Sequence, residues 1–114
     1  MKENIIVNKT FQFSLDIITL YKGLLDHHEY VLSKQLFRSA ISIGVNVTEA
    51  TAGQTKKDFI AKMAIASKEA RETRYWLKLL QQIQLVKGDY TVYLKSIDEI
   101  IKILTSIVKT SQEQ

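Results

Sequence analysis

The sequence contains no cysteine and no proline, and only four of its 114 residues are glycine. The lack of cysteine excludes disulfide bonds and thiolate metal ligands, and it fits a reducing compartment. With so few helix breakers and turn residues, the chain is expected to be mostly helical. No apolar run approaches the ~20 residues of a membrane-spanning helix, and the amino-terminal segment does not resemble a signal peptide. We therefore expect a single cytoplasmic domain, residues 1–114, with no membrane association.

The most distinctive stretch is residues 33–53. Between Lys34 and Lys56, only Arg38 and Glu49 carry a charge. On a helical projection the apolar and small residues cover about 200°, against the ~100° stripe that suffices for packing on one side. The centre of this arc is formed by Leu36, Ala40, Ile43, Val47 and Ala50, with Phe37, Ile41, Gly44, Thr48 and Ala52 beside them. Such a helix is expected to be covered on more than one side, by its own bundle and by other subunits.

The spacing of apolar residues along the chain predicts four helices with short connections, which is typical of an all-α, antiparallel, up-down-up-down four-helix bundle. Ser33 is the predicted N-cap of the second helix, and Thr55 with Asp58 forms a capping box that opens the third. The predicted elements are an irregular tail over residues 1–9, helices over 10–28, 33–53 and 55–87, and a helix from 89–91 onward with a frayed end over 110–114.

Each predicted helix carries a line of apolar residues for the core. The lines are Phe11, Leu15, Ile18, Tyr21 and Leu25 in the first helix, widened by Ile17 and Leu24, and Phe59, Met63, Ala66, Ala70, Leu77 and Leu80 in the third. In the fourth they are Tyr90, Leu94, Ile97, Ile101, Leu104 and Val108, with a second line of Tyr93, Ile100 and Ile107. The second and fourth helices thus carry more apolar surface than one subunit is expected to cover, which predicts that identical copies associate.

Several polar groups lie on or beside these apolar faces. Glu69 and Glu72 fall on the apolar side of the third helix, whereas Arg38, Asn46 and Glu49 form the narrow polar line of the second. Buried charges are costly unless they are paired. The sequence therefore predicts a structural polar seam between the two helices, in which Arg38 bridges to Glu69 or Glu72.

A carboxylate metal-site enzyme that uses Glu49, Glu69 and Glu72 is the less favoured interpretation of the same residues. Bundle sites of that kind need Glu-x-x-His pairs, and the sequence has none. The adjacent His27 and His28 would point about 100° apart on a helix and could not share one ion. Since no cysteine is present and no serine has a histidine at helical reach, we predict no catalytic residue, no metal and no cofactor.

The positive charge of the chain is concentrated in residues 55–88, which contain eight basic and three acidic residues. This segment has a net charge of +5, whereas the whole chain has +4. Five of the cations, with one tyrosine among them, fall within about 120° on the third helix. These candidate nucleic-acid-binding residues are Lys57, Lys68, Arg71, Arg74, Tyr75 and Lys78. Such a face could bind phosphates and stack on a base, and the alternative is a solvated face held by charge pairs along the helix.

The stretch QLFRSAISIGVNVTEA resembles a small four-helix-bundle family. This family includes the proteins encoded in intervening sequences of bacterial large-subunit ribosomal RNA genes and the accessory variability determinants of diversity-generating retroelements. The matching residues are Gln35, Leu36, Arg38, Ser39, Ala40, Ser42, Ile43, Asn46 and Glu49, followed in a second block by Asp58, Phe59, Ala66, Glu69, Glu72, Trp76 and Leu77. The resemblance implies an antiparallel bundle that forms a homopentamer, and in the retroelement branch a role beside a reverse transcriptase and its RNA.

Three functions remain open from the sequence. The first is a non-enzymatic homo-oligomer, with five subunits as the resemblance implies, that binds RNA, DNA or a nucleic-acid enzyme through the basic face of the third helix. The second is an assembly protein with protein partners only, whose cations keep it soluble. The third is the carboxylate metal-site enzyme.

Overall fold

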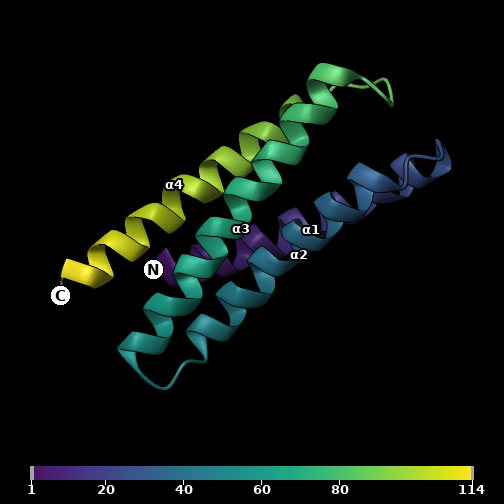
Figure 1. Ribbon diagram of the computed structural model, residues 1–114. Helices are drawn as coiled ribbons and strands as arrows, with labels where there is room; N and C mark the ends of the chain where they lie inside the picture. Colours follow the sequence, from purple (N-terminus) through teal and green to yellow (C-terminus); the bar gives the residue numbers. More distant parts are fainter. Residues whose placement is uncertain (1, 114) are drawn as a thin grey trace.

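The computed structural model describes residues 2–113, which form four helices packed side by side in a rod of 46 × 20 × 20 Å (Figure 1). The helices are α1 (Lys2–Asp26), α2 (Val31–Thr51), α3 (Lys56–Ile83) and α4 (Thr91–Glu113). Residues 2–113 contain no strand. The connections over 27–30, 52–55 and 84–90 are short, so consecutive helices run antiparallel. The predicted all-α, up-down-up-down bundle is confirmed.

The four helices pack as a square when the rod is viewed along its axis. α1 packs against α2 and α4, and α3 packs against the same two helices, so α1 and α3 lie diagonally across the bundle. The α1/α2 pair therefore occupies the side opposite the α3/α4 pair. In the described part of the chain, no helix is both long enough and apolar enough to cross a membrane.

All four helices contribute buried apolar residues to the core, and the most extensive packing is between α2 and α3. All five residues at the centre of the α2 arc are buried, as predicted: Leu36, Ala40, Ile43, Val47 and Ala50. The predicted line of α3 is buried from Met63 to Leu80, and Phe59 is half-buried beside it. Two hydroxyls cross this apolar interface, with Ser39 Oγ at 2.8 Å from Thr73 Oγ1.

The amino-terminal part of α1 differs from the prediction. Residues 2–9 are helical and not an irregular tail, while Met1 lies outside the described residues. Ile6 and Thr10 are buried, and the Thr10 hydroxyl donates to the Ile6 carbonyl at 2.8 Å. Burial of Ile6 against the bundle stabilises about two more helical turns, which precede the predicted start at Thr10.

The main core line predicted for α1 was wrong, whereas Ile17 and Leu24, predicted to widen it, are buried. The residues that enter the core are Ile6, Phe13, Ile17 and Leu24. Phe11 is 66% exposed and Leu15 is 45% exposed, so the predicted line begins on the surface. α1 carries two adjacent apolar lines, and spacing alone does not tell which of them faces the bundle.

The start of α2 is set by Glu29 and not by Ser33. The Glu29 carboxylate accepts hydrogen bonds from the N–H groups of Leu32 at 2.7 Å and Ser33 at 2.8 Å. Ser33 is itself inside the helix, where its hydroxyl donates to the Glu29 carbonyl at 2.7 Å. The predicted cap of α3 is confirmed, because Thr55 Oγ1 accepts from the Asp58 N–H at 3.1 Å.

The carboxyl-terminal ends of α2, α3 and α4 also differ from the prediction. α2 ends at Thr51, close to the predicted stop at Gly53. α3 ends at Ile83 and not at Lys87, because Gln84 adopts a left-handed conformation with φ of 56° and its side chain bonds the backbone of Gly88. α4 remains helical through Glu113, so residues 110–113 are not frayed in the structure, and Gln114 lies outside the described residues.

The second apolar line of α4 is mostly covered within the subunit. Ile100 and Ile107 are buried, whereas Ile101 and Val108 of the predicted main line are only half-buried. The apolar surface that α4 leaves partly uncovered is therefore carried by Ile101 and Val108 and not by the second line, and its contact with other subunits stays a prediction. Large apolar side chains are exposed on all four helices, and on α1 and α2 they include Phe11, Leu15 and Val45.

Candidate functional surfaces

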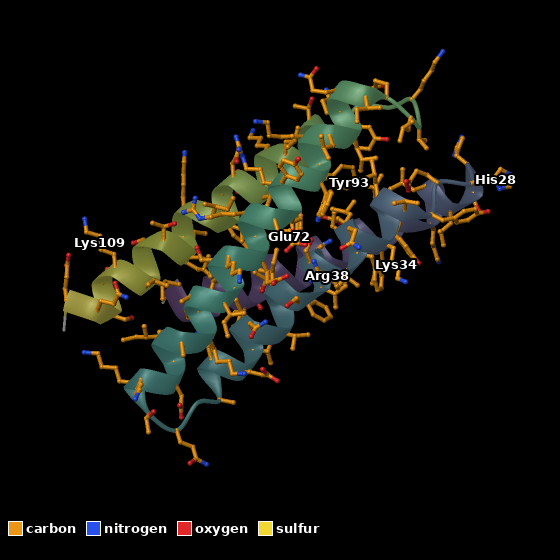
Figure 2. All side chains as sticks on the ribbon, in the orientation of Figure 1. His28, Lys34, Arg38, Glu72, Tyr93 and Lys109 are labelled. Carbon is orange, nitrogen blue, oxygen red and sulfur yellow. The ribbon has the colours of Figure 1, made fainter. Side chains whose placement is uncertain are left out.

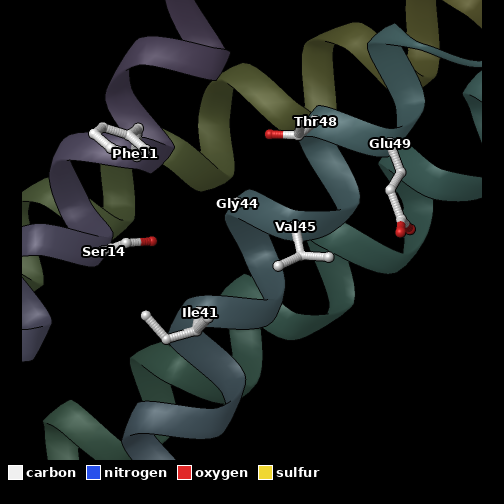
Figure 3. A pocket seen from close by; sticks show the side chains of 7 residues that line it. All are labelled: Phe11, Ser14, Ile41, Gly44, Val45, Thr48 and Glu49. Atoms are coloured by element: carbon white, nitrogen blue, oxygen red, sulfur yellow. The ribbon is translucent and has the colours of Figure 1, made fainter.

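An apolar groove runs between α1 and α2. One hollow of about 440 Å³ lies where α1 and α2 face each other near their midpoints, and a second of about 630 Å³ continues along α2. Figure 3 shows Phe11 and Ser14 of α1 facing the α2 residues that line the first hollow. The α2 residues of the first hollow are Ile41, Gly44, Val45, Thr48 and Glu49. The second hollow shares Ile41 and Val45 and adds two aromatic residues, Tyr21 and Phe37, and four polar ones, Lys34, Gln35, Arg38 and Ser42. We call this surface the α1/α2 groove.

The floor of the groove depends on small residues. A Cβ at Gly44 would lie 3.3 Å from Ser14 Oγ and 3.6 Å from the Thr10 carbonyl oxygen. Ser14 itself turns back to donate to that carbonyl at 3.0 Å. The two helices thus approach each other closely at Gly44, and the larger side chains of Phe11 and Val45 stand on either side of the hollow.

The predicted pairing of Arg38 is confirmed. Its Nη1 lies 3.3 Å from a carboxylate oxygen of Glu69, and its Nη2 donates to Glu72. Figure 2 shows Arg38 and Glu72 facing each other between α2 and α3. The Glu69 side chain is only 15% exposed, and the Trp76 Nε1–H donates to Glu72 at 3.2 Å. The seam is therefore a cation shared by two carboxylates at the edge of the core.

Of the other two residues predicted in this seam, Glu49 pairs with Lys62 of α3 farther along the α2/α3 edge, whereas the Asn46 amide hydrogen-bonds within α2. The Asn46 amide donates to the Ser42 carbonyl at 2.9 Å, within its own helix. Glu49 accepts from Lys62 Nζ at 3.0 Å on the surface. Among the side chains that the structure describes, no three histidine, aspartate or glutamate residues converge on a common point as metal ligands would.

The basic residues predicted on α3 lie along its outer side in two rows. Lys57, Lys68 and Lys78 are exposed and make no ion pair with a described side chain. Tyr75 lies among them, 57% exposed, with its ring edge-on to Trp76 at 5.3 Å between centroids. We call this outer row, Lys57, Lys68, Tyr75 and Lys78, the α3 ridge.

The side chains of the other two predicted residues, Arg71 and Arg74, contact α4. Arg71 Nη2 donates to the Thr105 hydroxyl at 3.2 Å, and Arg74 Nε donates to Asp98 at 2.7 Å. Arg74 is therefore neutralised locally, whereas Arg71 has an uncharged partner.

Sequence reasoning missed three cations on α4. Lys95, Lys102 and Lys109 are exposed and recur every seven residues, which places them on one side of the helix. Residues 89–114 hold three basic and four acidic residues, so averaging over the segment hid this row. The seven-residue repeat of lysine was the signal available in the sequence.

Comparison with known proteins identifies relatives for nearly the whole chain. The profile of the 23S rRNA-intervening sequence protein family matches residues 2–106. The crystal structure of a protein of unknown function from the S23 ribosomal protein family of Bacteroides thetaiotaomicron is 43% identical to this chain. It aligns over 96% of this chain and 99% of its own length, with a TM-score of 0.90. No curated protein matches the chain. The chain therefore belongs to the 23S rRNA-intervening sequence protein family.

Proposed function

We propose that this chain is a non-enzymatic helical bundle that associates with copies of itself through the α1/α2 groove and binds nucleic acid through the α3 ridge. The observation that carries the proposal is the row of unpaired cations on α3 with an exposed tyrosine among them. Lysines without acidic partners attract phosphates, and an exposed aromatic ring offers a face on which a base can stack.

Self-association is supported by the groove on the opposite side of the bundle. Phe11, Leu15 and Val45 are large apolar side chains left exposed around it, and clustered exposure of this kind is typical of protein interfaces. We propose five subunits, the number that the family resemblance implies. The resemblance to retroelement accessory proteins extends the proposal to a nucleic-acid enzyme, such as a reverse transcriptase, as a protein partner.

The nucleic-acid role is tested by charge reversal on the ridge. We expect K68E/K78E to weaken binding to labelled RNA and duplex DNA at least tenfold in anisotropy titrations at low salt. The matched control is K22E/K87E, which makes the same change in net charge at two other exposed lysines. Equal affinities for the two variants would remove the ridge from the proposal.

A second function is an assembly protein with protein partners only. The apolar hollows between α1 and α2 favour it, since they suit a helix of another chain better than a phosphate backbone. The two functions are separated by titration of the wild-type protein with nucleic acid. No binding to RNA or DNA at 50 mM salt, together with recovery of a protein partner after nuclease treatment, would favour this second function.

A further inference from the structure

A groove on the α3/α4 side of the bundle continues the basic surface beyond the α3 ridge. Two hollows, of about 470 Å³ and 270 Å³, lie end to end between α3 and α4, and Arg71 lines both. The first is also lined by Arg74, Asp98, Ile101 and Lys102, and the polar residues of the second are Ser67, Thr105, Lys109 and Gln112. We call this surface the α3/α4 groove.

We propose that the α3/α4 groove holds the sugar–phosphate backbone of a nucleic acid, with Lys102 and Lys109 of α4 on one wall and Arg71 of α3 on the other. This inference rests on the proposed nucleic-acid binding and adds to it the path of the strand and the residues of a second helix.

The charges in the groove favour a polyanion. Its lining holds four cations and a single acidic residue, Asp98. Asp98 is already paired with Arg74 at 2.7 Å, so the charges of Arg71, Lys102 and Lys109 are left without a described acidic partner. Arg71 uses one of its five N–H donors on the uncharged Thr105, so the guanidinium keeps donors for a phosphate.

The spacing of these cations suits a chain of phosphates. Lys102 and Lys109 are two helical turns apart, which is about 10.5 Å at ~1.5 Å per residue. A DNA duplex has one phosphate of each strand about every 3.4 Å of its helix axis, so a duplex that lies along the groove passes about three phosphates of one strand over this interval. A nucleic acid carries a phosphate at every nucleotide and so supplies negative charge along the whole groove, and we therefore favour nucleic acid as the occupant.

The same contacts predict how the groove discriminates between sequences. Lysine, arginine and the Thr105 hydroxyl would all contact phosphates, and phosphate contacts fix position without reading bases. Tyr75, on the neighbouring α3 ridge, stacks on any base. Binding is therefore expected to be independent of nucleotide sequence and strongly dependent on salt.

The test compares two pairs of exposed lysines in the full chain. K102Q/K109Q removes the α4 wall, and K22Q/K87Q removes the same charge from α1 and from the loop before α4. Anisotropy titrations use 20-nucleotide RNA and DNA of two unrelated sequences between 50 and 200 mM salt. We expect K102Q/K109Q to bind about tenfold more weakly, with a salt slope smaller by about 1.4 to 1.8, since each lost phosphate contact removes about 0.7 to 0.9. The control is expected to stay within threefold of the wild type.

The possible failures are distinguishable. If K68E/K78E abolishes nucleic-acid binding while K102Q/K109Q binds as well as the control, the groove proposal is overturned and the proposed function is retained. A wild-type protein that binds no nucleic acid at 50 mM salt would overturn both. The assignment to the sugar–phosphate backbone would be overturned if K102Q/K109Q lost affinity for only one of the two nucleotide sequences. It would also be overturned if polyglutamate displaced RNA as effectively as unlabelled RNA does. Circular dichroism and light scattering establish that the variants keep the fold and mass of the wild type.

Discussion

Arg38 pairs with two carboxylates at the α2/α3 edge, and its replacement tests how much that seam stabilises the bundle. Removing it would leave Glu69, which is mostly buried, without its cation. Exposed ion pairs contribute roughly 0–1 kcal/mol and breaking a buried pair costs roughly 3–5 kcal/mol, so a half-buried pair lies between them. We expect R38A to lower the free energy of unfolding in urea by about 1–2 kcal/mol.

The control for Arg38 is Lys62, whose pair with Glu49 lies on the surface. We expect K62A to cost less than about 1 kcal/mol. Adding E69Q and E72Q to R38A should recover part of the loss, because uncharged amides tolerate the absence of a cation. If R38A lost no more than K62A, the seam would be an ordinary surface contact.

Asp89 offers a test through pH. The Thr91 hydroxyl donates to its carboxylate at 2.5 Å and the Thr91 N–H donates at 2.9 Å, and these bonds hold the pKa of Asp89 below its ordinary value of 3.8. Since the folded-state pKa is lowered, the stabilisation of the first turn of α4 is complete above about pH 3.8 and is lost as the pH falls through the lowered value. We expect T91A, which removes the larger contribution, to raise the pKa of Asp89 toward 3.8 in an NMR titration. An unchanged Asp89 titration in T91A would contradict this origin of the shift.

At the scale of elements, α2 and α3 are joined by one buried polar contact in an otherwise apolar interface. Ser39 and Thr73 are both fully buried, and Thr73 Oγ1 also donates to the Glu69 carbonyl at 2.8 Å. We expect T73V to lower the free energy of unfolding by about 1–2 kcal/mol, because Ser39 loses its partner across the interface. The double variant S39A/T73V should lose less than the sum of the single variants, since neither hydroxyl is then left alone.

All four proteins are compared at one concentration, because association would make the midpoint depend on it. Thr19 provides the control, as its hydroxyl makes a longer bond, 3.4 Å, to the Leu15 carbonyl on the exposed side of α1. We expect T19V to change stability by less than about 0.5 kcal/mol. Strictly additive losses for Ser39 and Thr73 would show that the two hydroxyls do not act as a pair.

The helices themselves could be predicted because their apolar residues repeat with a helical period over long stretches, and α2 is the best example. Its core line was predicted correctly since no second line of large aliphatic residues competes with it. In α1 two such lines lie side by side, and only packing against α2 and α4 decides that Phe13 is buried while Phe11 is exposed. The start of α2 was misplaced because Glu29 caps it from four residues before Ser33, a contact that the local pattern does not reveal.

Of the three candidate surfaces, the sequence could predict the α3 ridge but not the two grooves, because each groove is formed by two helices. The α3 ridge is contained in one helix, so the spacing of its residues was enough to find it. The α3/α4 groove combines residues about thirty positions apart, such as Arg71 and Thr105, and which edge of α4 meets α3 depends on the packing of the bundle. The α1/α2 groove likewise needs Phe11 and Val45 to be placed on opposite sides of one hollow.

At the scale of the whole molecule, the apolar groove and the basic groove lie on opposite sides of the rod, because α1/α2 and α3/α4 are opposite pairs. Association through the α1/α2 groove would therefore leave every α3/α4 groove facing outward. We expect V45E, which places a charge in the apolar groove, to lower the mass in light scattering to that of one chain, 13.1 kDa. The matched control is V92E, at an exposed valine in the first turn of α4, which should leave the mass of the assembly unchanged.

The same two variants connect assembly to nucleic-acid binding. One α3/α4 groove extends from Asp98 to Gln112, which is about 21 Å at ~1.5 Å per residue. An 8-nucleotide RNA can thus occupy one groove, whereas a 40-nucleotide RNA can reach several in an assembly, and linked sites raise avidity by roughly 10²–10⁴. We expect V45E to bind the 40-nucleotide RNA at least tenfold more weakly than V92E and to bind the 8-nucleotide RNA equally well. Because the short RNA reports on the intact groove, a loss for both lengths would indicate damage to the bundle, and no loss for the long RNA would show that a single subunit is the binding unit.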